Sequence, residues 1–78
     1  MMAHDDLTDA ETRRLIAVGS IRFDGNARHK IYGSLSCRAG RRLLRRNRVF
    51  FASEAEALAA GYRPCGHCMK QAYAKWRG

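Results

Sequence analysis

The stretch Arg63-Pro64-Cys65-Gly66-His67-Cys68 sets the requirement that the rest of the chain has to meet. Two cysteines separated by two residues, after a proline and around a glycine, are typical of a metal-binding knuckle, because the short loop directs both sulfurs at one ion. A structural zinc site needs two further ligands, and the chain offers one more cysteine, Cys37, and three histidines. The sequence therefore predicts a zinc site built from this knuckle and a distant segment.

The length and the cysteine count favour a small domain that depends on a metal. A chain of 78 residues forms one domain with a marginal core, so a bound metal would add substantially to its stability. Three cysteines cannot form a complete set of disulfides, and we expect neither a signal peptide nor a membrane span. These features together predict a cytoplasmic monomer with reduced thiols and one zinc ion per chain.

Positive charge is concentrated in the middle of the sequence. The formal net charge is +8, and no acid occurs between Gly25 and Ser53. A dense field of one sign attracts polyanions, and arginine is better suited than lysine to bidentate phosphate contacts. We therefore expect nucleic acid, and DNA in particular, to bind at the arginines of this segment: Arg38, Arg41, Arg42, Arg45, Arg46 and Arg48.

Local signals predict an α+β fold without an internal domain boundary. We expect residues 1–7 to be a flexible acidic lead and residues 8–78 to be a single domain. Capping boxes that begin at Thr8 and Ser53, and an apolar stripe near the C-terminus, predict three helices: 9–18, 54–59 and 69–76. Alternating or β-branched runs predict three strands: 20–23, 30–33 and 48–52. The predicted architecture is a short antiparallel sheet with flanking helices.

The connections between these elements carry signals of their own. Asp24-Gly25-Asn26 is a strong turn signal and predicts a hairpin between the first two strands. Residues 34–39 are expected to form the loop that brings Cys37 to the knuckle. Residues 41–46 are expected to form at most a turn or two of helix, and Gly61 is the predicted C-cap of the second helix.

Cys37 is the third predicted metal ligand, although a cysteine can also be a small buried apolar residue. We expect the third strand and second helix to fold back and return Cys65 and Cys68 to the loop that carries Cys37. The fourth ligand stays open. His29 in the returning strand is favoured, His67 within the knuckle is the alternative, and water, a carboxylate or no fourth ligand are also consistent with the pattern.

Several segments also match one known family in the same order. They are Lys30-Ile31-Tyr32, Ser36-Cys37-Arg38, Asn47 to Phe51, Glu56-Ala57, Ala60 to Cys65, and Cys68. Over about Ile21 to Met69 the chain thus resembles the metal-binding domain of the Ada DNA-repair family. In that family four cysteines hold zinc, and the first accepts a methyl group from a DNA methylphosphotriester. The resemblance implies the same zinc-stabilised fold, with structural ligand roles for the three cysteines of this chain.

The chain departs from that family at the methyl-accepting position, which is Gly33 here. Glycine supplies neither a nucleophile nor a ligand, so the departure counts against methyl transfer. Small stand-alone relatives look as if histidine takes this place, and here His29 would have to do so from a displaced position.

Three functions are compatible with these observations. The first is a zinc-binding module that binds nucleic acid without being an enzyme. The second is a stoichiometric alkyl acceptor that uses one of the three zinc thiolates. The third is a protein-interaction domain, with or without metal, whose basic face meets an acidic partner. No serine–histidine or paired-carboxylate arrangement is visible, so a conventional enzyme is the least favoured class.

Overall fold

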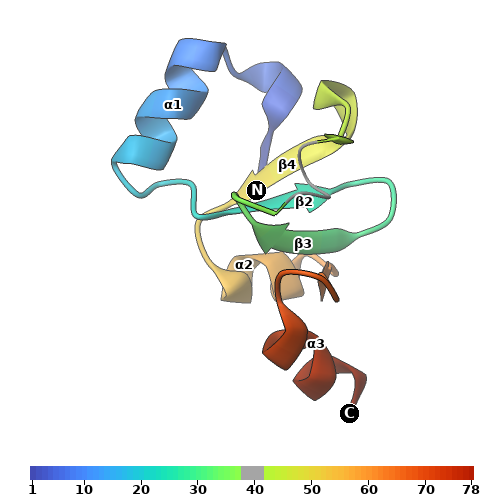
Figure 1. The fold of residues 1–78 in the computed structure, drawn as a ribbon. Coiled ribbons are helices and arrows are strands. Elements are labelled where there is room, and N and C mark those ends of the chain that lie inside the picture. The colour runs from blue at the N-terminus through green and yellow to red at the C-terminus, as the bar shows by residue number, and fades with distance from the viewer. Residues whose placement is uncertain (38–41) are drawn as a thin grey trace.

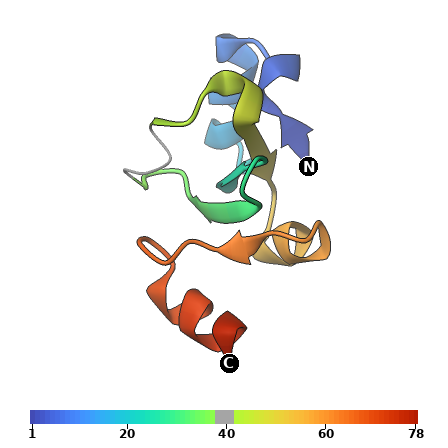
Figure 2. The ribbon, with the colours of Figure 1, turned by 90° about the vertical axis from the view of Figure 1, so that its right-hand side faces the viewer.

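The computed structural model describes residues 1–37 and 42–78. Its elements are β1 (Met2–Ala3), the 3-10 turn η1 (His4–Asp6), α1 (Asp9–Ala17), β2 (Phe23–Asn26), β3 (Ile31–Ser34), the 3-10 turn η3 (Arg45–Asn47), β4 (Arg48–Phe51), α2 (Glu54–Ala59), β5 (Arg63–Pro64) and α3 (Lys70–Arg77). Within the described residues the strands form one sheet in the order β1-β4-β2-β3-β5, in which only the β3–β5 pair is parallel. Figures 1 and 2 place α1 and α3 at opposite ends of the molecule, with the sheet between them.

The first helix begins as its sequence predicts. Thr8 Oγ1 accepts a hydrogen bond from the Glu11 backbone N–H at 3.1 Å, and Glu11 Oε1 accepts one from the Thr8 N–H at 2.9 Å. At α2 only half of the predicted capping box forms. Ser53 Oγ accepts the N–H of Glu56, whereas the Glu56 carboxylate pairs with the N-terminal amine of Met1 at 2.7 Å. Caps of this kind satisfy backbone donors that lack a partner within the helix.

The N-terminal residues correct one expectation. Instead of forming a flexible lead, Met2 and Ala3 pair with Phe50 and Val49 and add an edge strand to the sheet. The ring of His4 then packs edge-on against Phe50, with the two ring centroids 5.1 Å apart. Backbone pairing and this ring contact together position the first residues of the chain, which the acidic composition alone did not reveal.

The hairpin turn also lies elsewhere than predicted. Asp24, Gly25 and Asn26 belong to β2, and the turn falls at residues 27–30, where Lys30 has a φ of +57°. Gly25 is needed inside the sheet rather than at a turn, because a Cβ there would lie 2.9 Å from Cε2 of Phe51. The glycine therefore permits close packing at the centre of the sheet.

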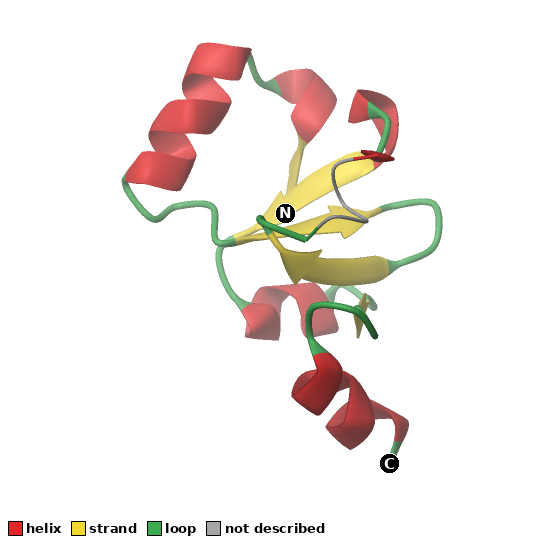
Figure 3. Ribbon diagram, viewed as in Figure 1, coloured by secondary structure: helices red, strands yellow, loops and turns green. Residues whose placement is uncertain are grey.

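The apolar core lies on one side of β3. It consists of Tyr32, Val49, Phe51, Ala57 and Tyr62, and the rings of Phe51 and Tyr62 meet edge to face with centroids 4.9 Å apart. In Figure 3 the short helix α2, which supplies Ala57, lies directly below the sheet. Side chains alternate along a strand, so Tyr32 and its neighbour Gly33 face opposite sides. The core consequently leaves the other side of β3 to the metal site. Among the helices that the structure describes, none combines the length and the hydrophobicity that a membrane span requires.

Candidate metal centre

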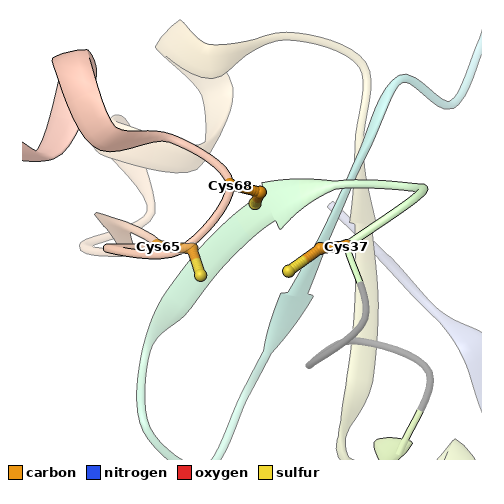
Figure 4. Close-up of side chains that lie close together, drawn as sticks. All are labelled: Cys37, Cys65 and Cys68. Atoms are coloured by element: carbon orange, nitrogen blue, oxygen red, sulfur yellow. The ribbon is translucent and has the colours of Figure 1, made fainter.

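Three thiols from two distant segments of the chain meet beside β3. The Sγ atoms of Cys37, Cys65 and Cys68 all lie within 4.8 Å of one another. Figure 4 shows Cys37 in the loop after β3 and the other two in the loop before α3, with the sulfurs of Cys37 and Cys65 directed toward each other. Tetrahedral zinc with Zn–S bonds of about 2.3 Å places its sulfurs about 3.8 Å apart. The thiol group therefore suits one zinc ion with little rearrangement.

Backbone hydrogen bonds fix the knuckle against β3. The Cys65 N–H donates to the Tyr32 carbonyl at 2.8 Å, which continues the parallel pairing of β5 with β3. The Ser34 N–H donates to Cys68 Sγ, and the His67 N–H donates to Cys65 Sγ, both at 3.4 Å. Donors that point at sulfur favour the thiolate form, which is the form that binds zinc.

The two knuckle thiols differ in acidity. Burial acts to raise the pKa of Cys65, but the N–H donors of the knuckle and the hydrogen bonds from the other two thiols together outweigh it and hold that pKa below the ordinary value. For Cys68, burial dominates and raises the pKa. A zinc ion bound here would keep all three sulfurs deprotonated, and its binding would release protons.

Gly33 occupies the position that faces the thiols from β3. A Cβ built on Gly33 would lie 2.7 Å from Cys68 Sγ and 3.3 Å from Cys65 Cβ. A side chain at this backbone position would thus enter the thiol group directly. With glycine present, β3 contributes no ligand of its own there.

The histidines proposed as a fourth ligand are not part of the thiol group. His29 is exposed in the turn before β3, whereas Ser34, which contacts Cys68, is at the opposite end of that strand. His67 is exposed on the knuckle, and the ring of His4 packs on Phe50. Within the described residues, the potential metal ligands whose donor atoms all lie within 4.8 Å of one another are the three cysteines. The favoured fourth ligand, His29, is therefore not placed at the site by this fold.

Asp24 is a buried acid that lines the same cavity as Cys37 and Cys65. The sequence alone did not identify it as a site residue. Asp24 is 6% exposed, and it forms an ion pair with Arg48, with 3.8 Å between Asp24 Oδ2 and Arg48 Nε. Burial raises the pKa of Asp24 to about 6, while Arg48 acts to lower it. Because Asp24-Gly25-Asn26 is a typical turn signal, the sequence predicts a turn at Asp24 rather than a buried strand position. The pairing of β2 with β3 is what brings Asp24 to the site.

The predicted nucleic-acid-binding arginines fall into distinct environments. Arg38 and Arg41 lie outside the described residues, and Arg42 and Arg46 are exposed. Arg45 pairs with Asp9 at 2.8 Å and with Asp5 at 3.5 Å, and Arg48 is half-buried beside Asp24. Within the described part of the segment expected to form at most a turn or two of helix, Arg42 and η3 have 3-10 conformation, and Leu43 and Leu44 between them are not helical.

The fold and the thiol group define a small α+β metal-binding domain, and comparison with known proteins identifies its family. The family model described as the metal binding domain of Ada matches residues 13–71. This chain therefore belongs to the Ada metal-binding domain family. That family binds zinc, so the predicted fold and the predicted zinc cofactor are both confirmed.

Two Escherichia coli comparisons agree with this assignment. The bifunctional transcriptional activator/DNA repair enzyme Ada is 56% identical over 36 residues, which are 46% of this chain and 10% of that protein. The refined structure of the DNA methyl phosphotriester repair domain of E. coli Ada is 34% identical and has a TM-score of 0.60. That match covers 85% of this chain and 76% of the repair domain. The chain thus corresponds to one domain of a much longer relative.

Proposed function

We propose that this chain is a zinc-stabilised module that binds DNA through exposed arginines beside the metal centre, without transferring a methyl group. The observation that supports this most is the position of Leu43, which lines the same cavity as Cys37 and Cys65. Leu43 follows Arg42, so the arginine segment, by which we mean residues 42–48, borders the thiol group. A phosphate backbone bound there would pass close to the zinc site.

The charge distribution supports a polyanionic partner. Arg42 and Arg46 are exposed on this segment, and Arg45 is tied to Asp9 and so holds the segment against η1 and α1. No acid follows Glu56 in the sequence, and the residues after it add further cations: Arg63, Lys70, Lys75 and Arg77. Contacts of this kind bind phosphate without reading base sequence, so binding should be salt-dependent and weakly specific.

Gly33 is the basis for proposing that no methyl group is transferred. The related E. coli protein is described as repairing DNA methyl phosphotriesters. In this chain, the position from which a side chain would enter the thiol group carries no sulfur. The zinc thiolates here would serve as structural ligands that hold the knuckle on β3 and keep the arginine segment in place.

Fluorescence anisotropy with a labelled DNA duplex, measured over a range of salt concentrations, tests the binding proposal. Replacing Arg42 and Arg46 together with alanine should weaken binding and reduce the slope of log affinity against log salt by about two. The matched control replaces Arg13 and Arg14 with alanine. Both are exposed on α1, and their replacement removes the same charge. Equal losses in both double variants would show that net charge alone drives binding.

Intact-mass measurement tests the second half of the proposal. After incubation with DNA that carries methylphosphotriesters, the mass of the zinc-loaded protein should be unchanged. A gain of one methyl group on any cysteine would overturn the non-enzymatic proposal and establish an alkyl acceptor. DNA binding without such a gain supports the proposal as stated.

A further inference from the structure

The metal centre has three thiols and lacks a fourth donor from the expected strand position. Zinc in a closed structural site takes four ligands, whereas a site with three keeps one position open. Gly33 faces the thiols, since a Cβ there would come within 2.7 Å of Cys68 Sγ, but it has no side chain to offer. A fourth donor must therefore come from a neighbouring residue or from outside the protein.

Asp24 lies directly opposite Gly33 in the antiparallel ladder of β2 and β3. Residues opposite each other in such a ladder direct their side chains to the same face of the sheet, with Cβ atoms about 5 Å apart. The Asp24 side chain thus projects on the face where the thiols gather. It lines, together with Gly33, Cys37 and Cys65, one cavity of about 300 Å³.

The burial of Asp24 needs an electrostatic explanation. Among the acids and histidines, all of which the structure describes, only Asp24 is buried. An ionised carboxylate away from water is costly unless it is paired or coordinates a metal. Its separation of 3.8 Å from Arg48 Nε is longer than the 2.7–2.9 Å of a charge-assisted hydrogen bond, so this pair offsets only part of the cost.

We propose that the Asp24 carboxylate supplies the fourth donor to the zinc ion held by Cys37, Cys65 and Cys68. Aspartate oxygen is an established zinc donor, and Asp24 projects from the strand position opposite Gly33. Its carboxylate lies outside the group of sulfurs that are within 4.8 Å of one another, so the side chain has to move toward the ion when it binds. Arg48 then partly balances the negative charge that a fourth anionic donor brings. The inference concerns the metal alone and is independent of whether the module binds DNA.

Zinc affinity, measured by competition with a chromophoric chelator, tests the proposal in a double-mutant cycle. Asp24→Ala should weaken zinc binding at least about tenfold, since losing partners outside the ligand shell already costs about 10- to 100-fold. Asp6→Ala, which removes an exposed carboxylate, is the charge-matched control and should leave the affinity within about twofold of wild type. In a Gly33→Cys background, which supplies a fourth thiol, Asp24→Ala should have little effect.

Equal losses from Asp24→Ala in both backgrounds would overturn the proposal, because Asp24 would then act only through the fold or its charge. No loss in the wild-type background would overturn it too. If Gly33→Cys does not fold, X-ray absorption of zinc-loaded Asp24→Cys decides the matter. The sulfur count should rise from three in the wild type to four, and a count that stays at three would show that position 24 does not reach the metal.

Discussion

Tyr32 donates its hydroxyl hydrogen to Glu54 Oε2 at 2.9 Å and so connects β3 to the first turn of α2. The Tyr32 side chain is fully buried, whereas Glu54 is exposed. Burial and the neighbouring Glu54 raise the pKa of Tyr32 to about 12, so the hydroxyl stays protonated and remains a donor throughout the neutral range. The bond holds β3 in place, and Gly33, which follows Tyr32 in that strand, faces the metal site.

Tyr32→Phe should therefore lower the free energy of unfolding by about 1 kcal/mol, the usual net value of such a bond. The matched control is Tyr62→Phe, because the buried Tyr62 hydroxyl has no hydrogen-bond partner within the described structure. That control should be neutral or slightly stabilising. Urea denaturation of the zinc-loaded variants measures both changes, and a larger loss from Tyr62→Phe would contradict the assignment of these hydroxyls.

Gly61 ends α2 with a φ of +87°, a conformation that costs residues with a Cβ about 1–2 kcal/mol. A Cβ at this position would meet nothing within 4 Å, so any loss on substitution reflects the backbone alone. Gly61→Ala should lower the free energy of unfolding by about 1 kcal/mol, and Gly61→Asn should lower it less. Thermal denaturation of the two variants gives the comparison. Equal stability of the alanine variant and wild type would argue against the positive φ.

Thr8 should be worth about 1 kcal/mol through the cap that it provides to α1. Thr8→Ala removes the oxygen that accepts the Glu11 N–H, whereas Thr8→Ser keeps it and serves as the control. Circular dichroism during urea denaturation should show the loss only for alanine. A serine variant as unstable as the alanine variant would point to the threonine methyl group instead.

Zinc removal should destabilise the whole domain, because the thiols join the loop before α3 to the loop after β3, two segments distant in the sequence. At a free zinc concentration a thousand times the dissociation constant, binding contributes about 4 kcal/mol. Each kcal/mol shifts the melting temperature of a domain of this size by about 4–8 °C. Differential scanning fluorimetry with and without a chelator measures this shift in melting temperature. In Cys65→Ser the chelator should cause no shift. Coincident melting curves for loaded and stripped wild-type protein would contradict the prediction.

Local signals predicted those elements that depend on neighbouring residues. The cap at Thr8, the strand from Arg48, the helix after Ser53 and the end at Gly61 all follow from such signals. The N-terminal strand could not be predicted in this way, because Met2 and Ala3 become a strand only by pairing with β4. The turn signal at residues 24–26 failed for the same reason, since sheet pairing on both sides of Gly25 outweighs a local preference.

The sequence by itself determined the metal chemistry, because two thiols spaced by two residues, together with a third elsewhere in the chain, suit zinc whatever the surrounding fold. Only the tertiary structure supports our proposal of Asp24 for the fourth position. The exposed turn that carries His29 lies at the far end of β3 from Cys68. The ladder register sets Asp24 opposite Gly33 instead, and a shift of one residue would turn Asp24 to the other face of the sheet. Register arises from the packing of the whole sheet, which no local pattern in the sequence reveals.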